Sequence, residues 1–306
     1  MGNVTVSIII VSYNCPSLLR NSLNSIKANT VGLSYEIIII DNNSSISNAE
    51  VLALFNNIQY VQLPENVGFG KANNIGLEMA KGKYILFLNP DTVLLNNAIA
   101  LMANFLMANP EIGACGGNLY DIQMKPTRSF KRCFPSNSWL LGNILLGNKY
   151  ESILYGKSKI FNYGNLPIPV AYIVGADLMV RTSILKKIGG FNPLFFMYYE
   201  EVELCWRIHK AGYKIYSLPS AHIQHLEGKT SSNPEKRAKM MFDSSIIYYN
   251  LTLGKISNGI ARLLIFLMGI ERLIIYNFSC KKDNVLFWKI HLRCLLNNNI
   301  IRKFIV

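Results

Sequence analysis

"LFLNPDTVL", residues 86–94, is an apolar run that stops at Asn89-Pro90-Asp91 and then resumes. Asparagine, proline and aspartate are common in turns, so a plain turn is one interpretation. The other interpretation places Asp91 at the carboxyl end of a parallel strand, where open α/β sheets bind their ligands. The rest of the chain decides between them.

The first 110 residues alternate apolar runs with helical segments. We expect strands over 6–13, 35–41, 58–63 and 83–88, and helices over 16–29, 47–56, 68–82 and 96–108. This alternation predicts right-handed βαβ units in an α/β fold with a mostly parallel central sheet flanked by helices. Continuous apolar strands indicate that both faces of the sheet are covered. The polar strand ends then gather along one edge, where a nucleotide would lie: Ser12-Tyr13-Asn14, Asp41-Asn42-Asn43 and Asn89-Pro90-Asp91.

The remainder of the chain is less regular. Residues 120–170 are rich in proline, glycine and basic side chains, and we expect them to be mostly loop. Strands are expected over 170–180 and 213–219, with a helix over 198–212 between them. Beyond about residue 235 the chain is expected to be helical. We therefore predict a main domain over 1–235 and a basic, apolar helical region over 236–306.

The formal net charge of +13 is unevenly distributed. Residues 1–110 carry 5 basic and 6 acidic side chains, residues 111–254 carry 17 and 10, and residues 255–306 carry 9 and 2. A neutral first third and a basic remainder indicate an anionic partner for the later part, such as a nucleic acid, an anionic membrane or a phosphorylated substrate.

The six cysteines are scattered without a Cys-x-x-Cys pair, which is typical of reduced thiols in a cytosolic protein. We find no signal-peptide pattern at the N-terminus. The most membrane-like stretch, residues 259–278, is interrupted by charges, so it does not read as a membrane span. Two interpretations of it stay open: packing into protein, or lying in a membrane interface.

Two further groups of residues carry chemistry. Glu200, Glu201 and Glu203 crowd one helical turn, either as a solvated face or, because aromatic side chains surround them, as candidate general bases with raised pKa values. His222 and His225 follow the expected last strand, as ordinary histidines or as metal ligands. "ENVGFGKANNIG" lacks the glycine spacing of a dinucleotide fingerprint, and no P-loop or nucleophile elbow is present.

Five motifs in order make a more specific pattern: "VSIIIVSYN", "EIIIIDNNSS", "ENVGFGKANNIGLEMAKGKYILFLNPDTVL", "GGFNPLFFMYYEEVELCWRIHKAGY" and "LPSAHIQH". Together they resemble family 2 glycosyltransferases with the GT-A fold, and especially the bacterial rhamnosyltransferase-like branch that builds surface polysaccharides such as O-antigen. The resemblance covers about residues 4–250. It implies a donor-binding half over about 1–110 and an acceptor half over about 111–235.

The resemblance also implies roles for single residues. The donor nucleotide is expected against Ser12, Tyr13, Asn14, Asp41, Asn66, Gly68, Asn74 and Asn89. Asp91 and His225 are the implied ligands of Mg²⁺ or Mn²⁺, and Asn89 replaces the first aspartate of the usual Asp-x-Asp motif. Glu201 is the implied general base, at a position where the family usually has Asp. Gly175, Ala176, Asp177 and Glu200 are implied on the acceptor side.

The resemblance predicts an inverting enzyme that moves a sugar, rhamnose or another hexose, from a nucleotide-diphosphate donor to a glycan or a lipid-linked acceptor. Such an enzyme would be cytoplasmic, and residues 255–306 would rest on an anionic membrane surface or form a lid or a homodimer contact. Asn89 and Glu201 motivate an alternative, a catalytically degenerate scaffold or sugar-binding subunit. A nucleotidyltransferase lacks support because the first strand leads into "SYNCPSLLR" rather than a Gly-rich basic loop. A nucleic-acid binder would not explain the carboxylate-tipped strands.

Overall fold

The structure is a computed structural model that describes residues 4–55, 58–226, 233–278 and 282–297. The chain divides into two compact units. The sheet unit comprises residues 1–133, 157–196 and 200–230, and the helical unit comprises residues 134–156, 197–199 and 231–306. Residues 134–156 thus group with the C-terminal helices, whereas the sequence-based division at about residue 235 stays a prediction.

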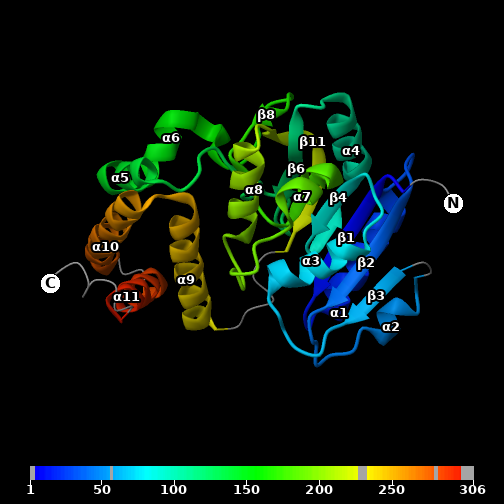
Figure 1. Cartoon of the computed structure of the whole chain (residues 1–306), viewed down its shortest axis with the longest axis horizontal. Coiled ribbons are helices and arrows are strands. Elements are labelled where there is room, and N and C mark those ends of the chain that lie inside the picture. Colours follow the sequence, from blue (N-terminus) through cyan, green and yellow to red (C-terminus); the bar gives the residue numbers. More distant parts are fainter. Residues whose placement is uncertain (1–3, 56–57, 227–232, 279–281, 298–306) are drawn as a thin grey trace. The chain divides into compact units, whose positions relative to one another are not determined.

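The sheet unit is built on a sheet in which β1 to β4 lie side by side (Figure 1). The strand order among the described residues is β3-β2-β1-β4-β10-β6-β11-β5, and β8 pairs with β11. The strands are β1 Val6–Ser12, β2 Tyr35–Asp41, β3 Ile58–Gln62, β4 Tyr84–Leu88, β5 Thr92–Leu94, β6 Ile112–Tyr120, β8 Ile168–Pro169, β10 Asp177–Arg181 and β11 Lys214–His225. A separate small ribbon pairs β7 Phe130–Lys131 with β9 Tyr172–Ile173.

Helices of this unit connect the strands and cover the sheet. They are α1 Pro16–Asn29, α2 Ala49–Leu52, α3 Phe69–Met79, α4 Ala98–Ala108, α7 Thr182–Ile188 and α8 Glu200–Lys210. Every residue of β1 and β4 is buried, as the continuous apolar runs predict for strands covered on both faces. The predicted α/β architecture is confirmed. β10 and β5 run antiparallel to their neighbours, so the parallel part of the sheet is its N-terminal half together with the β6–β11 pair.

Two sequence-based expectations are corrected here. The last strand is longer than predicted, so His222 and His225 lie inside β11 rather than after it. Residues 120–170 are not mostly loop, because they contain α5 Asn137–Leu146 and α6 Tyr150–Tyr155. The hydroxyl of Ser136 accepts a hydrogen bond from the Trp139 amide at the start of α5, a helix-start signal that the flanking proline and glycine residues obscured.

The helical unit contains α5 and α6 with α9 Pro234–Thr252, α10 Lys255–Phe278 and α11 Lys282–Asn297. α10 packs on α5, where the Arg272 guanidinium donates to the Asn143 carbonyl at 3.0 Å. One stripe of α10 is buried: Ala261, Ile265, Met268 and Arg272. The opposite stripe is exposed: Ile256, Ile260, Leu263, Leu267, Ile270, Ile274 and Phe278. No helix in the described part of the chain is long and apolar enough to cross a membrane.

Candidate active site

The carboxyl ends of β1, β2 and β4 meet along one edge of the sheet. β1 pairs in parallel with β2, with Ser12 opposite Asp41, and β1 also pairs in parallel with β4. This register brings the polar strand ends together, as the sequence predicts. The turn after β4 follows the same edge, since the Asn89 amide donates to the Ala176 carbonyl at 2.9 Å. Asp91 is therefore a residue of this edge rather than of an isolated surface turn.

Asp41 organises the loop that follows β2. Its Oδ1 accepts from the Ser44 amide at 2.7 Å, and its Oδ2 accepts from Asn48 Nδ2 at 2.7 Å and from the Tyr60 hydroxyl at 2.9 Å. Burial, followed by the hydrogen bond and charge of Asp41, raises the pKa of Tyr60 to about 12. A carboxylate held by three donors has a fixed direction, which is what reading one face of a base or ribose requires.

Ser12 and Asn14 fasten the same loop, while Tyr13 is presented outward. Ser12 is fully buried and its hydroxyl accepts from Asn48 Nδ2 at 3.3 Å. Asn14 has a left-handed backbone, φ 53°, and its Oδ1 accepts from the Ser45 amide at 2.8 Å. The Tyr13 ring is 41% exposed. Among these three residues, Tyr13 offers the free surface on which a planar group can stack.

The turn before α3 is tied to the segment that leads toward α8. Asn66 Oδ1 accepts from Asn42 Nδ2 at 2.9 Å and from the Gly68 amide at 3.0 Å. Gly68 has φ +88°, and a Cβ there would lie 2.5 Å from the Phe196 carbonyl oxygen. Only glycine fits this close approach.

Asn74 lies on α3 with both ends of its amide engaged. Its Nδ2 donates to the Phe191 carbonyl at 2.7 Å, and its Oδ1 accepts from the Phe191 amide at 2.8 Å. Asn74 therefore links α3 to the backbone of Phe191, 117 positions further along the chain. Its side chain acts on the site by holding the segment from Phe191 onward.

Asp91 and His225 face each other at the strand edge. Asp91 Oδ1 lies 3.3 Å from His225 Nε2, and the side-chain nitrogen Nδ2 of Asn89 lies 3.4 Å from the same ring nitrogen. Two backbone interactions hold the pair: the Leu226 amide donates to the Asp91 carbonyl at 3.0 Å, and His225 pairs with Thr92 across the β5–β11 ladder. Residues that are 134 positions apart are thus held side by side.

This pair fits a divalent metal that substrate completes. One carboxylate and one imidazole are suitable ligands for Mn²⁺, and Mg²⁺ is commonly held by one or two carboxylates together with substrate phosphates. Among the described residues, no group of three or more His, Cys, Asp or Glu side chains forms a metal cluster. The remaining ligands would therefore come from the substrate and water.

Glu200 and Glu201 begin α8. Glu200 is buried, whereas Glu201 is partly exposed. Desolvation raises the pKa of Glu201 to about 7, although the backbone amides of Glu201 and Val202 and the charge of Arg128 act in the opposite direction. Desolvation and the neighbouring Glu201 also raise the pKa of Glu200. Glu201 Oε2 is buried and has no hydrogen-bond partner among the described residues, so this oxygen is an unsatisfied acceptor.

Glu203 does not join this pair. It forms a bidentate ion pair with Arg207, at 2.7 and 2.9 Å, one helical turn away. Of the three clustered glutamates, one is neutralised by an arginine and two are left at the helix N-terminus, where the helix dipole favours negative charge.

Two strained residues precede α8. Tyr198 and Tyr199 have φ values of 71° and 65°, in the left-handed region that non-glycine residues rarely adopt. They belong to the helical unit, where Ser244 Oγ donates to the Met197 carbonyl at 2.7 Å and the Tyr199 ring contacts Tyr248. Backbone strain of this kind persists only where packing enforces it.

The three residues Gly175 to Asp177, which the resemblance implies on the acceptor side, differ in position. A Cβ on Gly175 would lie 3.6 Å from Glu201 Cγ, so Gly175 borders Glu201 directly. Ala176 and Asp177 have no exposed surface. Asp177 Oδ2 accepts from the Gly117 amide at 2.5 Å, and burial raises the pKa of Asp177 to about 7. Ala176 and Asp177 therefore shape the site from inside the fold.

Sequence reasoning missed Asn48, Tyr60 and Arg128. Asn48 and Tyr60 are known only through their contacts with Asp41 across 7 and 19 residues. Arg128 lies in the segment expected to be loop, and its charge acts on Glu201. A basic side chain whose charge acts on a carboxylate leaves no local pattern when the two residues are distant in sequence.

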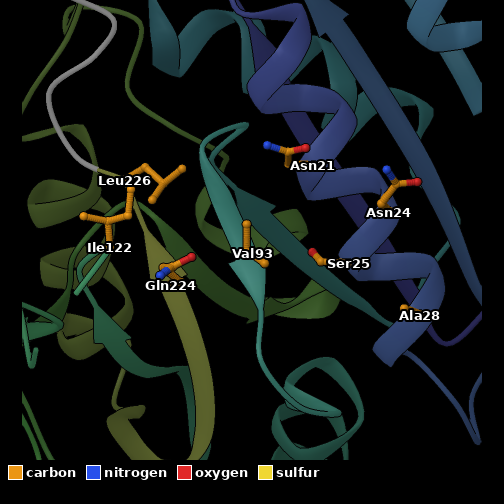
Figure 2. A pocket seen from close by; sticks show the side chains of 8 residues that line it. All are labelled: Asn21, Asn24, Ser25, Ala28, Val93, Ile122, Gln224 and Leu226. Carbon is orange, nitrogen blue, oxygen red and sulfur yellow. The ribbon is translucent and has the colours of Figure 1, made fainter. Parts of the chain in front are cut away.

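A separate groove of about 450 Å³ lies along α1, β5 and β11 (Figure 2). The residues that line it are Asn21, Asn24, Ser25, Ala28, Val93, Ile122, Gln224 and Leu226. None of them is a predicted site residue, and none carries a charge. Ser25 is already engaged, because its hydroxyl accepts from the Leu94 amide at 3.0 Å. The groove adjoins the strand edge, since the Leu226 amide donates to the Asp91 carbonyl, but Asp91 and His225 do not line it.

The sequence model of glycosyl transferase family 2 matches residues 7–189 of this chain. The chain belongs to this family. It is similar to the rhamnosyltransferase WbbL of Escherichia coli K12, at 27% identity over 72% of this chain and 83% of that protein. It is also similar to a poly-beta-1,6-N-acetyl-D-glucosamine synthase of Staphylococcus epidermidis, at 28% identity over 71% of this chain and 48% of the synthase. The chain thus spans about half the length of that synthase.

Solved structures show the same fold. GalNAc-T7, determined with UDP, GalNAc and Mn²⁺, superposes with a TM-score of 0.56 at 18% identity and covers 81% of this chain and 50% of its own. Staphylococcus aureus TarS superposes with a TM-score of 0.55 at 15% identity and covers 94% of this chain and 55% of its own. The resemblance predicted from the motifs is confirmed: this family 2 glycosyltransferase has the GT-A fold.

Proposed function

We propose that this protein is an inverting, metal-dependent glycosyltransferase that moves rhamnose or another hexose from a nucleotide-diphosphate donor to a glycan or lipid-linked acceptor. The observation that carries the proposal is Glu201, a partly exposed residue whose Oε2 atom is buried without a hydrogen-bond partner among the described residues and whose pKa is about 7. A base with a pKa near neutrality is suited to removing a proton from an acceptor hydroxyl.

The donor is proposed to bind at the strand edge. Tyr13 supplies a surface for the nucleobase, and Asp41 supplies a fixed carboxylate for the base or ribose. Ser12, Asn14 and Asn66 hold the surrounding loops in place. Gly68 and Asn74 fix the turn and helix that follow, so their contribution to donor binding is one of position.

The donor diphosphate is proposed to lie beside Asn89, Asp91 and His225. Mg²⁺ or Mn²⁺ bound there would neutralise charge on the leaving diphosphate. Asp91 and His225 supply one carboxylate oxygen and one imidazole nitrogen, held 3.3 Å apart. Asn89 lies 3.4 Å from the same imidazole nitrogen and replaces a carboxylate with a neutral amide, so it lowers the negative charge near the diphosphate.

The transfer is proposed to be a single displacement. Glu201 takes the proton of the acceptor hydroxyl as the hydroxyl oxygen forms a bond to the anomeric carbon. The bond from that carbon to the diphosphate oxygen breaks, and the diphosphate leaves with the electron pair. Attack opposite the leaving group inverts the anomeric configuration. Gly175 leaves room for the acceptor beside Glu201. Glu200 is proposed to lie on the acceptor side of Glu201.

The relatives support a role in polysaccharide synthesis, since they are named as a rhamnosyltransferase and a poly-beta-1,6-N-acetyl-D-glucosamine synthase, and we propose that the product is a surface polysaccharide such as O-antigen. We propose that the enzyme works in the cytoplasm at the inner face of the membrane. The exposed stripe of α10 supports this location, because an apolar helix face of this length together with a basic C-terminal region suits an anionic lipid surface. A homodimer through the same stripe is the alternative.

Donor turnover tests the proposal. Purified protein with Mn²⁺ or Mg²⁺ is mixed with a panel of nucleotide-sugars, and release of nucleoside diphosphate is followed for the wild type, Asp91→Ala and Glu201→Gln. We expect one donor to be turned over and both variants to lose at least about 100-fold in rate. If every donor fails to bind the wild type, the degenerate-scaffold alternative replaces this function.

A further inference from the structure

Arg128 is an exposed arginine on a firmly held piece of backbone. The Thr127 amide before it donates to the Leu119 carbonyl at 2.9 Å, and the Ser129 amide after it donates to the Ile160 carbonyl at 2.8 Å. Ser129 is fully buried. The chain therefore fixes the position of Arg128 while leaving its side chain in solvent.

The same backbone carries Arg128 to the border of the proposed base. The Val174 amide donates to the Ser129 carbonyl at 3.1 Å, which continues the pairing of β7 with β9. The next residue, Gly175, packs against Glu201. Arg128 and Glu201 thus flank the same glycine from two different segments of the sheet unit.

The guanidinium is close to Glu201 but not paired with it. Its positive charge opposes the desolvation that raises the pKa of Glu201. Within the described ranges, Arg128 forms no ion pair shorter than 4.0 Å and no hydrogen bond. Because the Arg128 guanidinium does not contact the Glu201 carboxylate, its N–H donors are available to another group that binds next to Glu201.

We propose that Arg128 is a specificity residue that binds a phosphate group on the acceptor, next to Glu201. This inference rests on the proposed transfer to an acceptor hydroxyl. A guanidinium binds phosphate oxygens with two parallel hydrogen bonds, and the surrounding segment has the basic excess that attracts such a ligand. Phosphate bound at Arg128 would hold the attached sugar near Glu201.

The phosphate can come from a lipid diphosphate or from a soluble sugar phosphate, and two probes distinguish these sources. Binding of farnesyl diphosphate and of glucose 1-phosphate is measured by calorimetry in EDTA, with farnesol and glucose as uncharged controls. The proteins are the wild type, Arg128→Gln, Arg128→Lys and the charge-matched control Lys125→Gln, whose side chain is exposed in the same loop.

We expect Arg128→Gln to weaken binding of at least one phosphate probe by about 10- to 100-fold, the loss expected for a charge-assisted hydrogen-bonded pair. Arg128→Lys should lie between it and the wild type because lysine keeps the charge but not the fork, and Lys125→Gln should stay within about twofold of the wild type. Unfolding temperatures measured in parallel should be equal, because the replaced side chains are exposed.

Equal binding of both phosphate probes by the wild type and Arg128→Gln overturns the inference. An Arg128→Gln protein whose only change is a higher apparent pKa in its pH–rate profile also overturns it, since the guanidinium would then serve Glu201 alone. Nucleotide-sugar binding by the wild type is measured separately. Its failure counts against the proposed function, whereas its success with unchanged phosphate binding counts against Arg128 only.

Discussion

At the scale of single residues, the proposed site depends on Glu201, whose pKa burial raises to about 7. Glutamate at position 201 has one methylene more than the aspartate usual in the family. Gly175 lies beside the Glu201 side chain, and a Cβ at position 175 would make ordinary van der Waals contact with Glu201 Cβ and Cγ at 3.6 Å. Gly175 therefore leaves space next to Glu201.

The pKa of Glu201 predicts the pH dependence of turnover. Because the ionised form is the base and its pKa is about 7, we expect kcat/KM to rise about tenfold per pH unit below about 7 and to level off above it. In Glu201→Gln, kcat/KM should be much lower than in the wild type and should no longer rise with pH in this range. A limb centred near the ordinary value of 4.5 would show that burial does not perturb this carboxyl group.

The same shift has a consequence for stability, which gives the prediction a second readout. The folded state binds the proton more tightly than the unfolded state, so stability should fall as the pH rises from about 4.5 through about 7. Glu201→Gln cannot ionise, so its free energy of unfolding should fall less over this range than that of the wild type. Urea titrations at pH 5 and pH 8 measure the difference.

At the scale of elements, α3 begins at a glycine that no other residue can replace without strain. Gly68 combines φ +88° with a Cβ position 2.5 Å from the Phe196 carbonyl oxygen. Gly32 has a similar φ, +78°, but nothing lies within 4 Å of its Cβ position. The two glycines therefore separate the cost of an unfavourable φ from the cost of a backbone clash.

Gly68→Ala should destabilise the protein by about 2–4 kcal/mol, and Gly32→Ala by about 1 kcal/mol, as measured by urea denaturation. We also expect only Gly68→Ala to lower kcat, because the displaced Phe196 lies just before the segment that starts α8. Similar losses in both variants would mean that the Phe196 contact yields without cost.

The elements also show how far sequence reasoning reaches. The strands and their polar ends were predictable because a continuous apolar run and the polar residues that end it are local features of the sequence. The Asn74–Phe191 tie joins residues 117 positions apart, and no local pattern signals it. α5 was missed because its neighbouring prolines and glycines indicate loop, while its partner Arg272 lies 129 residues from Asn143. The roles assigned to single site residues stay predictions.

At the scale of the whole molecule, the helical unit presents an apolar surface that the sheet unit's chemistry does not require. Spacing of three and four residues along α10 keeps Ile260, Leu263, Leu267 and Ile270 on one face, opposite the stripe that packs internally. A contiguous apolar face on this scale marks an interaction site.

Flotation of the full-length protein with vesicles tests the proposed lipid contact. We expect binding to vesicles that contain an anionic lipid, and a loss of about tenfold or more in the double variant Leu263→Gln, Leu267→Gln. Leu166→Gln is the control, since Leu166 is a strongly exposed leucine of the sheet unit. Unchanged binding by the double variant would contradict the lipid contact, and a wild-type dimer that the same substitutions dissociate would assign the stripe to self-association.

The left-handed backbone of Tyr198 and Tyr199 limits which substitutions the enzyme tolerates in the residues that hold it. Its conformation is unfavourable by itself and is held by the contact of Tyr199 with Tyr248 and by the hydrogen bond from Ser244 to the carbonyl of the preceding Met197, both from more than forty residues further along the chain. Because Glu200 and Glu201 follow directly, a change in α9 reaches the proposed base through the covalent chain. We therefore expect substitutions at Tyr248 to be epistatic with substitutions at Tyr199, and changes in α9 to affect the glutamates that follow Tyr199 in the chain.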